Sequence, residues 1–349
     1  MMTPKERWRA VMERRPVDRV PTDYWATGEV THALKKHFDL RTDLDLWQKL
    51  GIDRNVGIGP ALRDPHSEER DGANVWGLRH VRIAYAGGAG TYDEVVQSPL
   101  AGAETVQEIE SYPWPDPSWC DYGSIPDQCR EWKDYPIVGG SYEPFLLYTS
   151  LRGREQALED LVVNPQIVEA TLERIFEYHL EVISKTLEAA GGQVDFVYVA
   201  EDLGTQDSTI MSPGHFRRFL KPHMARMVEL AHTYGAWAFH HDDGACWPLL
   251  PELCDIGIDV LNPIQWRCGN LDRRWLKREF GSRLVFHGAV DNQYTLPFGT
   301  VDEVRQEVRD NLEMLGDGGG YILAPCHNLQ PITPIENILA MYDEAHGLA

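Results

Sequence analysis

The sequence predicts a single-domain α/β protein, a TIM-type (β/α)8 barrel spanning residues 1–349. Short apolar runs rich in β-forming residues alternate with helix-length amphipathic segments, which is typical of parallel βαβ units. Seven such runs occur, and seven or eight repeats favour a closed barrel over an open sheet. The glycine motifs GxGxxG and GxxxxGK[ST] are absent, so an open Rossmann-like sheet is the second choice.

The first predicted strand lies near the N-terminus, at residues 20–25, and the other six follow residue 135. Each run leads into glycine, proline or polar residues, as expected where a barrel strand meets its loop. The six later strands are expected at residues 137–138, 196–199, 236–239, 259–261, 284–286 and 321–323.

Four helix starts are marked by capping residues. A threonine or serine precedes a proline or begins a capping box at Thr3-Pro4, Ser212-Pro213, Thr300-Val301 and Thr333-Pro334. These residues provide side-chain caps for the first backbone N–H groups of a helix. We therefore expect helices to begin near residues 4, 213, 301 and 334.

Residues 55–135 differ from the rest of the chain, being rich in Pro, Gly, Asp, Trp and Tyr, with weak helix signals between about residues 75 and 100. Alternation near residues 75–83 suggests a short antiparallel excursion. We interpret this section as an insertion between the first and second barrel strands.

The charge and the cysteines exclude several classes of function. A net charge of −21 argues against binding to nucleic acid or to an anionic membrane. No apolar run is long enough to span a membrane, and the N-terminal residues lack the apolar core of a signal peptide. The six cysteines show no paired spacing, so we expect reduced thiols in a cytoplasmic protein.

The densest group of reactive side chains follows the predicted strand at residues 236–239 and reads His240-His241-Asp242-Asp243-Gly244. Extended residues two apart point the same way, so His240 pairs with Asp242 and His241 with Asp243 on opposite sides. Either pair could supply two metal ligands, or a histidine oriented by a carboxylate. A polar loop with Asp243 as a helix cap is the structural alternative.

A third candidate ligand, His327, follows the last predicted strand. The carboxyl ends of barrel strands meet at one face, so His327 is expected beside His241. Its neighbour Cys326 is an alternative ligand or nucleophile, although nothing in the sequence indicates a lowered thiol pKa.

Other strand ends carry candidates for acid–base and binding roles. Glu201, Asp202 and Asp291 could act as acid, base or outer partners of a metal, or simply cap helices. Arg152 could bind an anionic group of the substrate, although a surface ion pair is the more common role for such a residue. Tyr24, Trp25, Tyr142 and His240 are the remaining candidates for lining a substrate pocket, with core packing as the alternative for the aromatic residues.

Beyond these residues, the chain resembles the uroporphyrinogen decarboxylase superfamily over nearly its whole length. The resemblance rests on Glu201-Asp202-Leu203-Gly204-Thr205 with Ser212-Pro213, on the run at residues 256–263, on Gly288-Ala289-Val290-Asp291, and on Thr333-Pro334-Ile335-Glu336-Asn337. It implies a distorted (β/α)8 barrel. The superfamily includes the decarboxylase and zinc-dependent methyltransferases that move a methyl group from a corrinoid to a thiol.

The resemblance also implies a site. The methyltransferases' His-x-Cys-Gly zinc motif falls on His241-Asp242-Asp243-Gly244, and their later cysteine falls on His327. The implied ligands are therefore His241, Asp243 and His327. This harder donor set suits Zn²⁺, with Mn²⁺ or Fe²⁺ as alternatives. The departure from two cysteines argues against simple thiol methylation.

Three hypotheses of function follow. The first is a metal-dependent enzyme acting on a small oxygenated substrate, by methyl transfer or demethylation linked to a corrinoid carried on a partner protein. The second is a metal-dependent lyase or decarboxylase. True uroporphyrinogen decarboxylation is disfavoured because residues 20–29 contain none of the arginines that hold that substrate's carboxylates. The third is a non-catalytic binding protein. The sequence is compatible with a homodimer but does not predict the oligomeric state.

Overall fold

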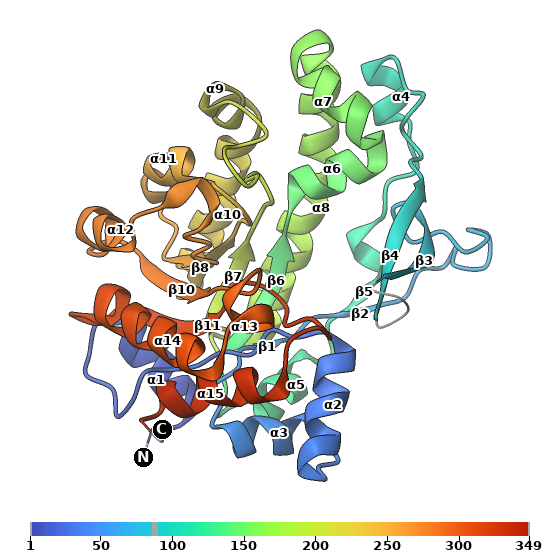
Figure 1. Cartoon of the computed structure of the whole chain (residues 1–349). Helices are drawn as coiled ribbons and strands as arrows, with labels where there is room; N and C mark the ends of the chain where they lie inside the picture. The colour runs from blue at the N-terminus through green and yellow to red at the C-terminus, as the bar shows by residue number, and fades with distance from the viewer. Residues whose placement is uncertain (1, 86–89, 348–349) are drawn as a thin grey trace.

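The computed structural model describes residues 2–85 and 90–347 and shows a curled parallel sheet surrounded by helices (Figure 1). Seven strands follow one another in the order β1-β6-β7-β8-β9-β10-β11, and every neighbouring pair is parallel. The strands are β1 (Val56–Gly57), β6 (Ile137–Tyr142), β7 (Phe196–Val199), β8 (Trp237–His241), β9 (Val260–Asn262), β10 (Val285–Val290) and β11 (Tyr321–Pro325). The predicted α/β barrel is confirmed.

The segment at residues 20–26 occupies the eighth position and closes the ring. Thr22 forms a parallel bridge to Leu323 of β11. On its other side, the Asp53 N–H donates to the Thr22 carbonyl at 2.7 Å, just before β1. The predicted first strand is thus represented by isolated bridges at Thr22 and Ala26 rather than by a continuous strand.

Apolar side chains fill the inside of the barrel near the amino ends of the strands. One cluster joins Val138, Phe196, Phe239, Val260, Val285 and Ile322 to Trp8 and Val11 of helix α1 (Pro4–Met12). The fully buried Trp8 ring meets Phe196 edge to face at 5.4 Å. Helix α1 therefore closes this end of the barrel, and the carboxyl ends of the strands are left for function.

The helices outside the sheet begin largely where the capping residues predict. Thr3 and Thr300 form complete capping boxes, and Ser212 accepts from the His215 N–H. The start near residue 334 is also correct, but Pro334 occupies the cap position and no side-chain cap forms there. The remaining helices are α2 (Gly28–Phe38), α3 (Asp43–Leu50), α6 (Pro144–Arg152), α7 (Arg154–Val163), α8 (Pro165–Ala190), α9 (Pro213–His215), α10 (Lys221–Thr233), α11 (Leu250–Asp255), α12 (Arg273–Phe280), α13 (Thr295–Phe298), α14 (Val301–Gly316) and α15 (Ile335–Ala345).

The excursion separates β1 from β6, the first two strands of the seven-stranded sheet. The antiparallel hairpin predicted there is present as β3 (Arg79–Tyr85) and β4 (Gly90–Gln97), and it projects from the barrel in Figure 1. The rest comprises β2 (Ala61–Leu62), α4 (Val106–Glu110), β5 (Cys120–Asp121) and α5 (Ile125–Glu131). The predicted insertion begins at residue 55 and so includes β1, which belongs to the barrel sheet. The sequence did not reveal β1, because a strand of two residues leaves no periodic signal.

Among the described residues, no helix combines the length and apolar character that crossing a membrane would need.

Candidate metal centre

The side chains at the end of strand β8 point alternately to opposite faces of the sheet. Tyr198 of β7 pairs with Phe239 of β8, and His241 lies two residues farther along on the same inward side. His240 and Asp242 are fully buried on the outward side, between the sheet and its helices, whereas the His241 side chain keeps 15% of its exposure. The predicted alternation therefore separates these histidines by environment.

His241, Asp243 and His327 come together at the mouth of the barrel. Each offers one ligand atom, and these atoms lie within 4.8 Å of one another. The His327 Nε2 atom is 3.4 Å from Asp243 Oδ2, and the two side chains are 36% and 30% exposed. A cluster that is half-buried and open to solvent can bind an ion and still leave a coordination position for a substrate.

Neighbouring side chains orient two of these candidate ligands. His241 Nδ1 lies 2.6 Å from the Asn262 side-chain oxygen, so its Nε2 atom is the one available to the cluster. Gln265 donates to Asp243 Oδ1 at 2.9 Å. The Trp25 ring stacks on His241 with centroids 5.2 Å apart. Ligands held this way lose little freedom when an ion binds.

Asp202 lies beside the cluster and adds negative charge. Its Oδ1 atom is 3.6 Å from His241 Nε2 and accepts the Asp243 N–H at 3.3 Å. Burial raises the pKa of Asp243, and the carboxylates of Asp202 and Asp242 add to the rise, while the two cluster histidines oppose it. A bound divalent cation would compensate this crowding of negative charge.

Cys326 points away from the cluster. Its thiol is buried and donates to the Ile264 carbonyl at 3.4 Å, and burial raises its pKa well above the usual value. A thiol in this state is a poor ligand and a poor nucleophile. The geometry therefore brings His327, rather than Cys326, to His241.

Glu201 and His240 are not brought to the cluster. Glu201 is buried behind the sheet, where Oε1 accepts the Phe145 N–H at 2.8 Å and burial raises its pKa well above the usual value. His240 Nδ1 donates to the Val199 carbonyl at 2.6 Å. Glu201 Oε2 and His240 Nε2 have no hydrogen-bond partner within the described part of the chain.

Three further candidates also face away from the mouth. Tyr24 is buried, and its hydroxyl meets Thr31 at 2.9 Å. Tyr142 packs edge to face on Phe176 behind the sheet. Arg152 forms a buried ion pair with Asp160 at 2.6 Å and donates to the Leu100 carbonyl. Packing was the alternative for the two tyrosines in the sequence, whereas the ion pair of Arg152 is buried and not at the surface as expected.

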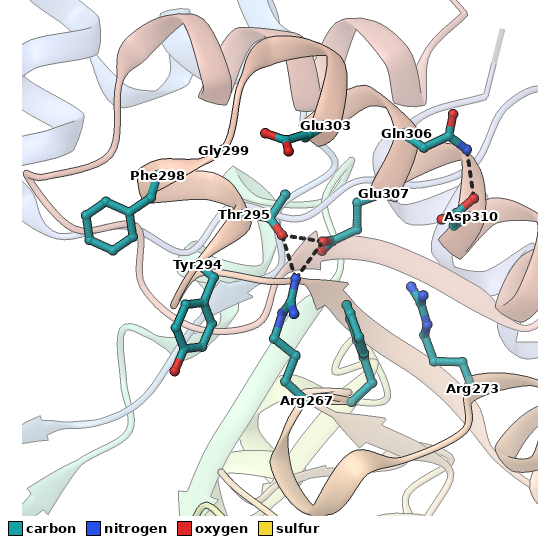
Figure 2. A pocket seen from close by; sticks show the side chains of 11 residues that line it. Arg267, Arg273, Tyr294, Thr295, Phe298, Gly299, Glu303, Gln306, Glu307 and Asp310 are labelled. Carbon is teal, nitrogen blue, oxygen red and sulfur yellow. Dashed lines mark hydrogen bonds and ion pairs between the residues drawn. The ribbon is translucent and has the colours of Figure 1, made fainter.

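Asp291 anchors the loop after β10. Its carboxylate accepts the N–H groups of Tyr294 and Thr295 and pairs with Arg267 at 2.8 Å. Figure 2 shows Arg267 reaching Thr295 and Glu307 in a pocket of about 440 Å³ at the rim of the barrel. This pocket is lined by residues that follow β9, by residues of α12 and α13, and by α14, and the three cluster residues do not line it.

A second cavity lies beside β1, β6 and β7, and the three cluster residues do not line it. It measures about 290 Å³ and opens to solvent. The described residues that line it carry no charge, and two of them are glycines: Asn55, Gly57, Ile58, Val138, Gly140, Ser141 and Tyr198. Such a surface suits a small neutral molecule with one or two hydrogen-bonding groups.

The fold and the cluster define a class of protein, a (β/α)8 barrel with a candidate metal centre at its mouth. A match to the uroporphyrinogen decarboxylase (URO-D) family covers residues 105–348, most of the chain. The chain therefore belongs to the uroporphyrinogen decarboxylase family, and the resemblance predicted from its motifs is confirmed.

Relatives in this family include both methyltransferases and decarboxylases. The chain is 26% identical over 208 residues to the methylcobamide:CoM methyltransferase MtaA of Methanosarcina barkeri, an alignment that covers 60% of this chain and 57% of that protein. It is 22% identical over 362 residues to the uroporphyrinogen decarboxylase of Shewanella halifaxensis, covering 99% and 97%. A solved methyltransferase from Methanosarcina mazei shares the fold, with a TM-score of 0.68, 23% identity and coverage of 99% and 98%.

The cluster fits a divalent metal. It offers an imidazole and a carboxylate from the end of β8 and a second imidazole from the end of β11, and this donor set is found in open catalytic sites. Sequence reasoning missed Asn262 and Gln265, which hold the candidate ligands. Asn262 ends β9, the strand next to β8, and Gln265 follows it, so their position at a neighbouring strand end was the available signal.

Proposed function

We propose that this protein is a metal-dependent enzyme that transfers a methyl group between a small oxygenated substrate and a corrinoid carried by a partner protein. One observation carries the proposal: His241, Asp243 and His327 present their ligand atoms within 4.8 Å at the barrel mouth. The likeness to a methylcobamide:CoM methyltransferase supports the choice of reaction. The uncharged cavity beside β1, β6 and β7 supports a small neutral substrate over a polycarboxylate.

In the demethylation direction, the methyl group leaves the substrate oxygen for a Co(I) corrinoid, and the electron pair of the C–O bond stays on the oxygen. That oxygen then needs a proton. Solvent supplies this proton, and Asp202 is placed to relay it, because its carboxyl lies 3.6 Å from His241 Nε2 and is 45% exposed. A divalent metal bound at the cluster would act as a Lewis acid on the substrate oxygen. Trp25 covers one face of His241 and limits access of water.

The first test is metal binding. We expect the purified protein to bind Zn²⁺. The variants His241→Ala, Asp243→Ala and His327→Ala should each lower the Zn²⁺ affinity by more than about 100-fold, the largest loss that is typical when a hydrogen-bond partner of a ligand is changed. The exposed residues His66 and Asp207 provide matched controls, because His66→Ala and Asp207→Ala should leave binding unchanged. If the parent holds no metal, or all three variants hold it equally well, the cluster is not a metal site.

The second test is the reaction. Incubation with methylcobalamin and candidate alcohols, phenols and thiols should form cob(I)alamin, which is followed by its visible absorbance. The reverse reaction should consume cob(I)alamin with the matching methyl ether. A protein that binds metal but neither forms nor consumes cob(I)alamin with any acceptor would not be a methyltransferase, and lyase chemistry would then take precedence.

A further inference from the structure

A buried carboxylate, Asp23, lies at the start of a hydrogen-bond chain that ends on His241. Asp23 is fully buried and accepts from Trp25 Nε1 at 2.9 Å, from Asn55 Nδ2 at 3.3 Å and from the Tyr24 N–H at 2.7 Å. Its fourth partner is His287 Nε2, at 3.0 Å. Three of these partners can only donate, and the hydrogen bonds to Asp23 hold its pKa below the usual value against the effect of burial, so its carboxyl is ionised.

The form of the buried His287 ring follows from this contact. A neutral imidazole facing an ionised carboxylate at Nε2 must carry its hydrogen there. Its Nδ1 atom then has a lone pair and can only accept. The side-chain nitrogen of Asn262 lies 2.6 Å from that atom and supplies the hydrogen. His287 and Asn262 are 0% and 1% exposed, so water does not compete for these contacts.

The last step fixes the metal-binding ring. Because the Asn262 nitrogen faces His287, its oxygen faces His241 Nδ1 at 2.6 Å. An amide oxygen accepts only, so His241 Nδ1 carries the hydrogen and Nε2 keeps its lone pair. A neutral imidazole binds a metal through such a lone pair. A flipped Asn262 amide would place the hydrogen on His241 Nε2 and close that position to an ion.

We infer that Asp23 and His287 are positioning residues that orient the Asn262 amide and thereby select the tautomer of His241 that can bind the metal. The inference rests on the proposed function, since it takes His241 as a metal ligand. Asp23 comes from the segment at residues 20–26 that closes the barrel. The same segment therefore completes the barrel and influences a candidate ligand on β8. It acts through three hydrogen bonds between side chains, which determine the tautomer of His241.

The test replaces Asp23 and measures two quantities at mildly alkaline pH. Competition with a chelator gives the affinity for Zn²⁺, and the imidazole ¹⁵N shifts of the metal-free protein give the tautomer of His241. We expect Asp23→Asn to weaken Zn²⁺ binding by about 10- to 100-fold, the range seen for outer partners of a ligand. We also expect it to shift His241 away from the Nδ1–H form. Asp160→Asn is the matched control, because Asp160 is equally buried and pairs with Arg152, away from residues 20–26 and from the hydrogen bonds that lead to His241.

A double variant separates positioning from general damage. In Asp23→Asn with Asn262→Asp, the carboxylate moves to the other side of His287. His287 can then take the opposite tautomer, while His241 still donates to residue 262. We expect Zn²⁺ affinity and the Nδ1–H form of His241 to return.

The two proposals fail in different ways. If the parent binds Zn²⁺ but Asp23→Asn changes neither affinity nor tautomer, or the double variant restores neither, the inference is overturned and the metal site stands. If the parent binds no Zn²⁺, the proposed function fails. The ¹⁵N shifts of the metal-free variants still decide whether Asp23 sets the His241 tautomer.

Discussion

At residues 240–243, where β8 ends, the side chains that point into the barrel have a different environment from those that point outward. On the inward side, His241 and Asp243 keep 15% and 30% of their side-chain exposure and meet His327 at the open mouth. On the outward side, His240 and Asp242 have no exposure. Asp242 accepts the N–H groups of Leu203 and Gly204 at 2.8 and 3.0 Å. Identical residue types therefore form the candidate metal centre on one side and hold a loop on the other.

The largest effect is expected when Asp242 and Asp243 are replaced by alanine in two separate variants and their stabilities are compared. Asp242→Ala leaves the buried Leu203 N–H and the half-buried Gly204 N–H without an acceptor, so we expect a loss of about 3 kcal/mol in the free energy of unfolding. Asp243→Ala removes a part-exposed carboxylate and should cost under about 1 kcal/mol while abolishing metal binding. Urea denaturation of both variants tests this. Equal destabilisation would mean that the two sides are not functionally distinct.

A smaller effect is expected from Glu201→Gln, which tests the outward side through pH. Burial raises the pKa of Glu201, so the folded protein keeps a proton there that the unfolded chain releases. Rising pH above the unfolded value therefore favours the unfolded parent. Glutamine cannot titrate, so the stability of the variant relative to the parent should increase between about pH 5 and about pH 8. A constant difference in melting temperature over this range would show that Glu201 is ionised in the fold.

The smallest effect is expected at the inward side, from the ring that covers His241. Aromatic pairs contribute about 0.5–1.5 kcal/mol, so Trp25→Leu should weaken Zn²⁺ binding by about 2- to 10-fold. Trp25→Phe keeps a ring but loses the hydrogen bond to Asp23, and should lie between the parent and the leucine variant. Chelator competition measures both. If the two variants bind Zn²⁺ as the parent does, the stacking contributes nothing to the centre.

The barrel and the three clustered residues could be predicted because both leave local or family signals. Apolar runs mark most strands, and motif positions select His241 over His240 and His327 over Cys326. The period of two predicted that His240 and His241 would separate, but not which side faces the lumen. Glu201 and His240 were therefore site candidates from the sequence, and only the strand pairing and burial show that they lie on the outer side of the sheet. Asp23 gave no signal, because its partner His287 is 264 positions away in the chain.

The closure of the ring by residues 20–26 against β11 has a consequence for biosynthesis. During translation, β8 leaves the ribosome with His241 and Asp243 before β11 and His327 exist. Pairings between distant segments form slowly and late in folding. A nascent chain therefore offers an ion two donors on an incomplete sheet, and Asp23 still lacks the β11 backbone that holds its segment in place. The proposed metal would therefore bind the mature chain rather than the growing one, because the third candidate ligand follows the last strand of the sheet.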